Sequence, residues 1–226
     1  MEVKLINKPT LEFIDSGIGM CWDKGSYGTD NEKGLARIDR VCNKMKHSSM
    51  LRFADYIFHV ELSTSALIEW TRHQVGVDYA VTSTRYVTKQ NVEGIKVEYS
   101  KNDLVNKMLD SHIEDIKNLI KDNPTIGNDD LKLLLPQGFL YKMQVKFNAQ
   151  SLQHFILLRS SKDAHYHIRE LAIEVYRAIP SDHKFLFEGI IKGEENVPKG
   201  QTFIFTCNHN TLLDIPVTCP YIPGAN

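Results

Sequence analysis

The stretch FLYKMQVKFNAQSLQHFILLR, residues 139–159, joins a strand pattern directly to a helix pattern. Its first part alternates with the period of two of a half-buried strand, and one face consists of Phe139, Tyr141, Met143, Val145 and Phe147. After Asn148 the spacing becomes helical, so that Gln150 and His154 share one face of the helix. Arg159 lies about 140° round the helix from His154. The helix therefore has two polar faces, which could serve two ligands.

Hydrophobic patterns elsewhere predict further strands and several helices. Strands are expected in ADYIFHVEL, residues 54–62, and in VKLIN, residues 3–7. Helices are expected at 31–46, 64–71, 102–121 and 164–178. The helix at 102–121 is amphipathic, and its apolar side is formed by Val105, Met108, Leu109, His112, Ile113, Ile116, Leu119 and Ile120. Asp129 and Asp130 are expected to cap a helix.

The composition fits one globular domain in the cytoplasm. The 226 residues include 27 basic and 28 acidic side chains, which gives a formal net charge of −1. This balance produces no basic field of the kind that nucleic-acid-binding proteins carry, so any anion must be bound locally. The cysteines lack CxxC spacing, the amino terminus lacks an apolar signal core, and no apolar run approaches the ~20 residues of a membrane helix. We expect a reduced, cytoplasmic protein without nucleic-acid or membrane partners.

A second stretch, TRHQVGVDYAVTSTRY at residues 71–86, could bind an anion. Arginine suits phosphates and pyrimidine carbonyls because its planar fork donates paired hydrogen bonds and keeps its charge. The candidates are Arg72, Arg85 and Arg159. Ser83 and Thr84 add hydroxyl and backbone N–H groups immediately before Arg85. On spacing alone, the alternative of solvated surface ion pairs is favoured, and His73 is better explained as a helix cap or a packed residue.

Other chemistry-bearing residues form no known pattern. His165, His167, Cys207 and His209 match no zinc spacing, so we expect no metal site. The sequence also contains no P-loop, no G-x-G-x-x-G and no G-x-S-x-G motif.

Taken together, three blocks of sequence resemble the flavin-dependent thymidylate synthase family. The family signature is an Arg-His-Arg triplet, a short spacer and Ser-x-Arg-Tyr. In this sequence RHQ at 72–74 takes the place of the triplet, and STRY at 83–86 takes the place of Ser-x-Arg-Tyr. HSSMLRF at 47–53 resembles an upstream block, and LPQGFLYKMQVKFNAQSLQHFILLRSS at 135–161 resembles the strand and helix downstream. The resemblance implies an α/β (α+β) fold, like thymidylate synthase complementing proteins: one domain, residues 1–192, with a mixed sheet and long helices. It implies a homotetramer with shared active sites, and leaves residues 193–226 as an extension of unknown role.

The resemblance also implies an activity and a role for each matched residue. Such enzymes make dTMP from dUMP, with methylenetetrahydrofolate as the one-carbon donor and FAD reduced by NADPH. The residues implied to bind dUMP are Arg72, Ser83, Thr84, Arg85, Arg159 and, from a neighbouring subunit, Lys132. The residues implied to line FAD are His47, Ser49, Arg72, His73, Gln74, Asn148, Gln150 and His154. Arg159 is the expected catalytic residue, because a fixed cation against the uracil ring stabilises negative charge that develops there.

The departures from the family pattern fall on the flavin side. Gln74 and Gln150 stand where the family has arginines, and Arg52 and Phe53 stand for a Glu-His pair. Each Arg-to-Gln change removes a charge-assisted hydrogen bond of about 1.5–3 kcal/mol, which Arg52 is expected to restore. Two alternatives stay open: a diverged relative that hydroxymethylates a pyrimidine deoxynucleotide or uses dCMP, and a nucleotide-binding protein without catalysis.

Overall fold

The computed structural model describes residues 2–22, 32–87 and 95–190. The described residues form a four-stranded sheet in which each neighbouring pair of strands is antiparallel. In order across the sheet, the strands are β1 (Glu2–Asn7), β2 (Asp55–Ser63), β4 (Leu140–Asn148) and β3 (Val77–Val81). The expected combination of a sheet with long helices is confirmed, and the strands run antiparallel throughout rather than in mixed directions.

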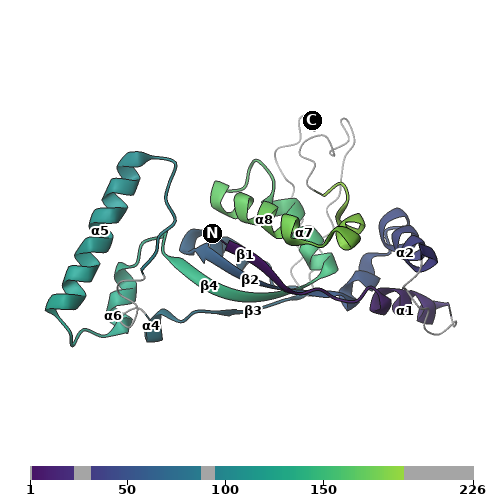
Figure 1. Ribbon diagram of the computed structural model, residues 1–226, viewed down its shortest axis with the longest axis horizontal. Helices are drawn as coiled ribbons and strands as arrows, with labels where there is room; N and C mark the ends of the chain where they lie inside the picture. The colour runs from purple at the N-terminus through teal and green to yellow at the C-terminus, as the bar shows by residue number, and fades with distance from the viewer. Residues whose placement is uncertain (1, 23–31, 88–94, 191–226) are drawn as a thin grey trace, which may run out of the picture. The chain divides into compact units, whose positions relative to one another are not determined.

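Three helices pack against this sheet: α3 (Thr64–Trp70), α7 (Ala149–Arg159) and α8 (Tyr166–Ala178). Of these, α7 and α8 lie side by side on one face (Figure 1). Alternate apolar side chains of β2 and β4 are buried against these helices: Tyr56, Phe58, Val60, Leu62, Met143, Val145 and Phe147. Tyr141, on the same predicted face as Met143, is only half-buried. The ring of Trp70 lies 5.7 Å from that of Phe147 and 4.3 Å from that of Phe155. This aromatic cluster packs α3 against α7, the two helices that carry most of the predicted site.

Side-chain caps set where α3 and α7 begin. The Ser63 hydroxyl accepts a hydrogen bond from the Ala66 N–H at 3.4 Å and so caps α3. The side-chain Oδ1 of Asn148 accepts from the Ser151 N–H at 2.9 Å, so β4 passes directly into α7 as the sequence predicted. After α8, a 3-10 helix at Ser181–Phe187 closes the described part of the chain.

Short helices lie at the end of the sheet where β2 begins (Figure 1). They are α1 (Glu12–Cys21), α2 (Glu32–Ile38), a π-helical turn (Asp39–Lys44) and a 3-10 helix (Ser48–Phe53). The fully buried Asp15 carboxylate accepts from Arg37 Nε at 2.7 Å and Nη2 at 2.6 Å, which joins α1 to α2. The helix predicted at 31–46 is thus α2 and its π-helical continuation.

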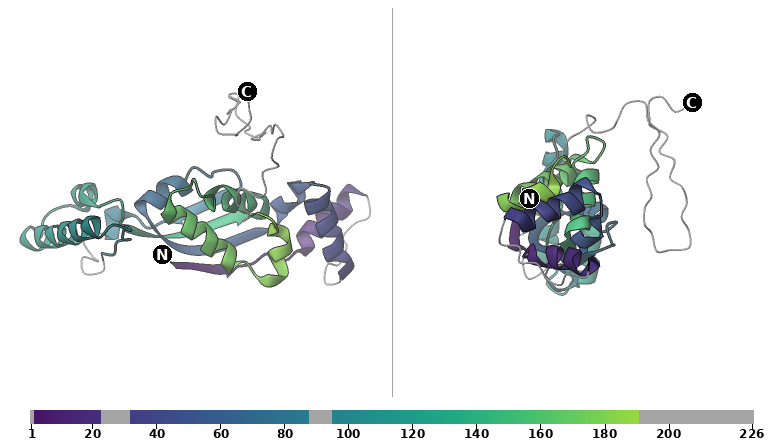
Figure 2. Two further views of the ribbon diagram at one scale, coloured as in Figure 1. Left: turned by 90° about the horizontal axis from the view of Figure 1, so that it is seen from above. Right: turned by 90° about the vertical axis from the view of Figure 1, so that its right-hand side faces the viewer.

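A second apolar cluster lies beyond the end of β3 (Figures 1 and 2). It is built by α5 (Asp103–Asp122) and α6 (Asn128–Leu131). Two short elements, α4 (Thr84–Val87) and a 3-10 helix (Lys132–Leu134), pack beside α6. Its buried members are Ile113, Ile116, Ile120 and Leu131. Val105 and Met108, on the apolar side that the sequence predicted for this helix, are 44% and 75% exposed. The first half of α5 presents its apolar side chains outward.

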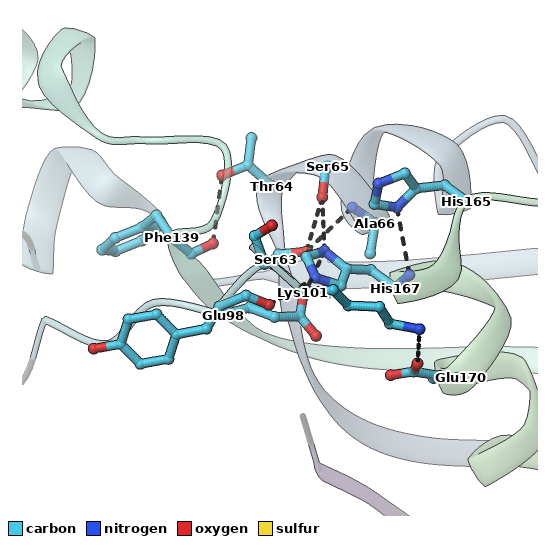
Figure 3. Close-up of polar contacts among 12 residues, drawn as sticks. Ser63, Thr64, Ser65, Ala66, Glu98, Lys101, Phe139, His165, His167 and Glu170 are labelled. Atoms are coloured by element: carbon cyan, nitrogen blue, oxygen red, sulfur yellow. Dashed lines mark hydrogen bonds and ion pairs between the residues drawn. The ribbon is translucent and has the colours of Figure 1, made fainter. Parts of the chain in front are cut away.

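Buried polar contacts hold the segment before α5 against the main core (Figure 3). The Glu98 N–H donates to the Gly138 carbonyl at 2.8 Å, and Glu98 Oε2 lies 3.2 Å from Nδ1 of the buried His167 on α8. His167 Nδ1 also lies 3.5 Å from the Ser63 hydroxyl, while Nε2 faces the Tyr99 carbonyl at 3.3 Å. His167 therefore links α8, the start of α3 and the segment that leads to α5.

The extension predicted at 193–226, with Cys207 and His209, lies outside the described residues. Within the described ranges, no cluster of three or more His, Cys, Asp or Glu side chains has the arrangement of a metal site. No helix in the same ranges is long and apolar enough to cross a membrane.

Candidate functional site

Arg159, on the last turn of α7, is held by the last turn of α3. Its Nη1 donates to Glu69 Oε2 at 2.6 Å, its Nη2 donates to the Glu69 carbonyl at 3.0 Å, and its Nε donates to His73 Nε2 at 2.9 Å. The side chains of Arg159 and Glu69 are only 16% and 25% exposed. Charge-assisted bonds in a partly buried setting are stronger than exposed ones, so the guanidinium has a fixed orientation. Arg159 is therefore not one of the solvated surface ion pairs that spacing alone favoured.

His73 is both a packed residue and a partner of Arg159. Its ring lies edge-on to Phe155 at 5.2 Å and to His154 at 5.9 Å. Burial, together with the charge of Arg159, lowers the pKa of His73 to about 4. At neutral pH the ring is therefore uncharged, and Nε2 accepts the hydrogen bond from Arg159 while Nδ1 carries the proton. Because His73 contacts both Arg159 and His154, the two polar faces of α7 are connected through one imidazole.

The start of α7 carries a second polar cluster. Arg52 Nε donates to Gln150 Oε1 at 2.7 Å, and Gln150 Nε2 donates to the Ser48 hydroxyl at 2.8 Å. The structure thus places the Arg52 cation directly against the glutamine that stands for an arginine in the family pattern. Phe53, the next residue, is 58% exposed beside it. Whether Arg52 replaces the missing arginine charge toward FAD stays a prediction.

Asn148 is positioned by a close approach of the turn that follows α3. Gly76 has φ of +66°, and a Cβ on it would lie 2.0 Å from Asn148 Nδ2 and 2.6 Å from the Ser151 hydroxyl. The Ser151 hydroxyl donates to the Val75 carbonyl at 2.6 Å, and the Asn148 N–H donates to the Gly76 carbonyl at 3.0 Å. A residue without a side chain is therefore required at 76.

The predicted phosphate-binding residues form a third cluster, between α4 and α6. Arg85 donates to the Asp129 carboxylate through Nε at 2.9 Å and Nη2 at 3.1 Å, and Lys132 Nζ lies 3.6 Å from the same carboxylate. The hydrogen bonds from Arg85 lower the pKa of Asp129. Asp129 is not the helix cap that we predicted, because α6 is capped by Gly127. Instead, its carboxylate forms ion pairs with Arg85 and Lys132, two of the side chains that are expected to bind a phosphate.

The other predicted residues are placed on the surface. Ser83 is exposed at the turn into α4, and Thr84 is half-buried as its first residue. Arg72 and Gln74 flank His73 in the turn after α3, and both are exposed. The exposed residues His47 and Ser49 adjoin Ser48 at the start of the 3-10 helix that carries Arg52, and His154 is exposed on α7. These exposed polar side chains are accessible to a ligand.

Within the described chain, the predicted dUMP residues do not form one site. Arg159 and His73 lie where α7 covers the sheet, whereas Arg85 and Lys132 lie with α4 and α6 beyond the end of β3 (Figures 1 and 2).

Sequence reasoning missed three partners that organise these clusters: Glu69, Ser48 and Asp129. Glu69 and Arg159 are 90 residues apart, so no local spacing indicates that pairing. Asp129 is distant in sequence from Arg85, and no local pattern indicates that pairing.

Comparison with known proteins identifies relatives over most of the chain. The family model for thymidylate synthase complementing protein matches residues 14–181. The flavin-dependent thymidylate synthase of Campylobacter jejuni (strain RM1221) is 34% identical over 204 residues, which covers 83% of this chain and 96% of the relative. That of Helicobacter pylori (strain 26695) is 31% identical over 209 residues, covering 85% of this chain and all of the relative.

The fold also matches solved structures. A crystal structure of thymidylate synthase X from Helicobacter pylori with FAD and dUMP superposes with a TM-score of 0.77 at 30% sequence identity. The match covers 85% of this chain and 99% of the solved chain.

Proposed function

Because the chain belongs to the family of flavin-dependent thymidylate synthases, we propose that it converts dUMP to dTMP, with methylenetetrahydrofolate as the one-carbon donor and NADPH as the reductant through FAD. The observation that supports this most is Arg159, a partly buried cation held in a fixed orientation by Glu69 and His73. A preorganised cation stabilises charge that develops on a bound ring without reorganising during the reaction.

We assign the remaining dUMP contacts to residues that bind anions and hydroxyl groups. Arg72, Ser83, Thr84, Arg85 and Lys132 would hold the phosphate and sugar. Because Arg85 and Lys132 of one chain share the Asp129 carboxylate, we expect these two side chains to reach the site together, from a subunit that neighbours the one whose Arg159 meets the ring. A phosphate would replace the Asp129 carboxylate on Arg85 and Lys132. These are exposed pairs, at 61% for Arg85 and 55% for Asp129, and such pairs contribute little to stability, so an incoming phosphate can displace the carboxylate readily.

The surface at the start of α7 suits FAD by its set of donors. Arg52, the serine hydroxyls of 48 and 49, and the amides of Gln150 and Asn148 gather at the amino-terminal end of a helix, where the backbone also favours negative charge. We assign FAD to this surface, with His47, Arg72, His73, Gln74 and His154 as further contacts. When bound, FAD supplies the reducing equivalents taken from NADPH. The role of Arg52 is to supply the charge that Gln150 lacks.

Replacing Arg52 with alanine is expected to weaken FAD binding by at least about tenfold, because a charge-assisted hydrogen bond is worth about 1.5–3 kcal/mol. Titration of the flavin absorbance measures the dissociation constant. Lys33→Ala, which removes an exposed cation from α2, is the control and should leave it unchanged. Adding Gln150→Arg to the Arg52→Ala variant should restore most of the affinity. An unchanged affinity in Arg52→Ala contradicts the assignment.

We propose a homotetramer, since the predicted dUMP residues are divided between separate parts of the chain. Leu104, Val105 and Met108 form an exposed apolar surface on α5, with side chains that are 71%, 44% and 75% exposed, respectively. A surface of this kind suits a contact with another subunit. Met108→Glu is expected to raise the dissociation constant of the assembly at least about tenfold, or 1.4 kcal/mol. Sedimentation velocity over a range of concentrations measures this shift.

Lys121→Gln is the control for Met108→Glu, because it makes the same change in net charge at the other end of α5. It should sediment as the unaltered protein does. If Met108→Glu also sediments unchanged, the α5 surface is not the subunit contact.

Product analysis tests the activity itself. The purified protein should form dTMP when supplied with dUMP, methylenetetrahydrofolate, NADPH and FAD, and none when FAD is omitted. Parallel reactions with dCMP, and a search for hydroxymethylated products, distinguish a diverged relative. Binding of dUMP without any product would instead indicate a nucleotide-binding protein. We also expect a cytoplasmic location, which cysteines without CxxC spacing favour.

A further inference from the structure

Glu69 makes a two-point contact with Arg159 that no sequence motif indicated. Both its carboxylate and its main-chain carbonyl accept from the guanidinium, at 2.6 and 3.0 Å. Helices α3 and α7 are packed together by Trp70 and Phe155, so Glu69 is attached to a rigid element. The two contacts therefore restrict rotation of the guanidinium as well as its position.

The N–H bonds of Arg159 that Glu69 and His73 do not use determine how a ligand can contact the guanidinium. A guanidinium has five N–H bonds in a fixed plane. Within the described residues, three of them are directed at Glu69 and His73, so up to two are left to meet a ligand. Because His73 is uncharged at neutral pH, Glu69 carries the negative charge that is paired with this partly buried cation.

We propose that Glu69 is a positioning residue, which acts through Arg159 by fixing the plane of the guanidinium against the uracil ring. This inference rests on the proposed function. Glu69 holds Arg159 before substrate arrives, so the cation does not have to be reoriented in the reaction. Its effect falls on the chemical step, because the phosphate and sugar of dUMP are assigned to other residues.

Steady-state kinetics of four variants tests this role. Glu69→Ala is expected to lower kcat for dTMP formation by about ten- to one hundredfold, with KM for dUMP within about threefold of the unaltered value. Glu69→Gln keeps an acceptor oxygen at the same reach and should retain kcat within about threefold. Glu69→Asp keeps the charge but is one methylene shorter, so it should be impaired like Glu69→Ala. Glu114→Ala, an exposed carboxylate on α5, should have no effect.

The ranking of the variants by kcat distinguishes a positioning role of Glu69 from other roles. If the charge alone matters, Glu69→Asp is active and Glu69→Gln is not, and the proposal is overturned. It is also overturned if kcat of Glu69→Ala stays within twofold, or if only KM changes. Thermal unfolding and FAD titration of each variant identify loss of fold. If Glu69→Ala is unstable, the comparison of kcat between Glu69→Gln and Glu69→Asp decides whether Glu69 positions Arg159. Absence of dTMP formation in the unaltered protein would refute the proposed function instead.

Discussion

Arg159→Ala is expected to lower kcat for dTMP formation by about 10²- to 10³-fold, the loss found when one preorganised stabilising donor is removed from an active site. The guanidinium is aligned by three hydrogen bonds, and no other described cation shares these contacts with Glu69 and His73. Initial rates of dTMP formation at saturating dUMP measure the effect. FAD binding should persist, since Arg52 and Gln150 are not touched.

Arg177→Ala serves as the matched control for Arg159→Ala. Arg177 is also a helical arginine paired with a glutamate, Glu174, but its side chain is 68% exposed on α8. Its removal should change kcat by less than about twofold, because exposed pairs contribute at most about 1 kcal/mol. A kcat for Arg159→Ala within tenfold of the unaltered protein would exclude Arg159 as the catalytic residue.

Gly76→Ala is expected to lower the free energy of unfolding by about 3–5 kcal/mol, through backbone strain at positive φ, loss of the α7 cap and displacement of packed atoms. The added Cβ would overlap Asn148 Nδ2 at 2.0 Å. Asn148 cannot yield without losing its bond to the Ser151 N–H. Chemical denaturation measures the change, and FAD binding should weaken in parallel because Asn148 is an assigned flavin contact.

The control for Gly76→Ala is Gly189→Ala. Gly189 also has a positive φ, +77°, but a Cβ on it would have no atom within 4 Å. Alanine at 189 should therefore cost only the about 1–2 kcal/mol of left-handed backbone strain. Equal losses at the two positions would show that the contact between Gly76 and Asn148 is unimportant.

The sequence predicted the fold correctly where a local residue pattern determines which side chains are buried or where a helix begins. The alternation in 139–147 predicted which side chains of β4 are buried, and Asn148 marked the start of α7. Helical spacing in α5 was also correct, but it could not indicate that Met108 is exposed in the single chain. Whether an apolar face is covered depends on what packs against it, and a neighbouring subunit is not encoded in the periodicity.

The residues of the candidate site could be predicted from the sequence, but which of their side chains pair with each other could not. Arg159 and His73 were identified from the family motif, while their connection requires the end of α3 to meet the end of α7. Arg52 could be proposed as a replacement cation because charge had been lost at Gln150, and the geometry places the two side chains 2.7 Å apart. Pairing across distant segments depends on the tertiary fold, which local propensity does not specify.

The most direct test of the account follows the flavin spectrum of the FAD-loaded protein under anaerobic conditions. NADPH should bleach the flavin band, and the band should return only when dUMP and methylenetetrahydrofolate are both added, with dTMP appearing in the same sample. This result would show that FAD and the one-carbon donor act on dUMP in one reaction. A protein that binds dUMP but takes up no flavin, or a band that returns without dTMP, would contradict it.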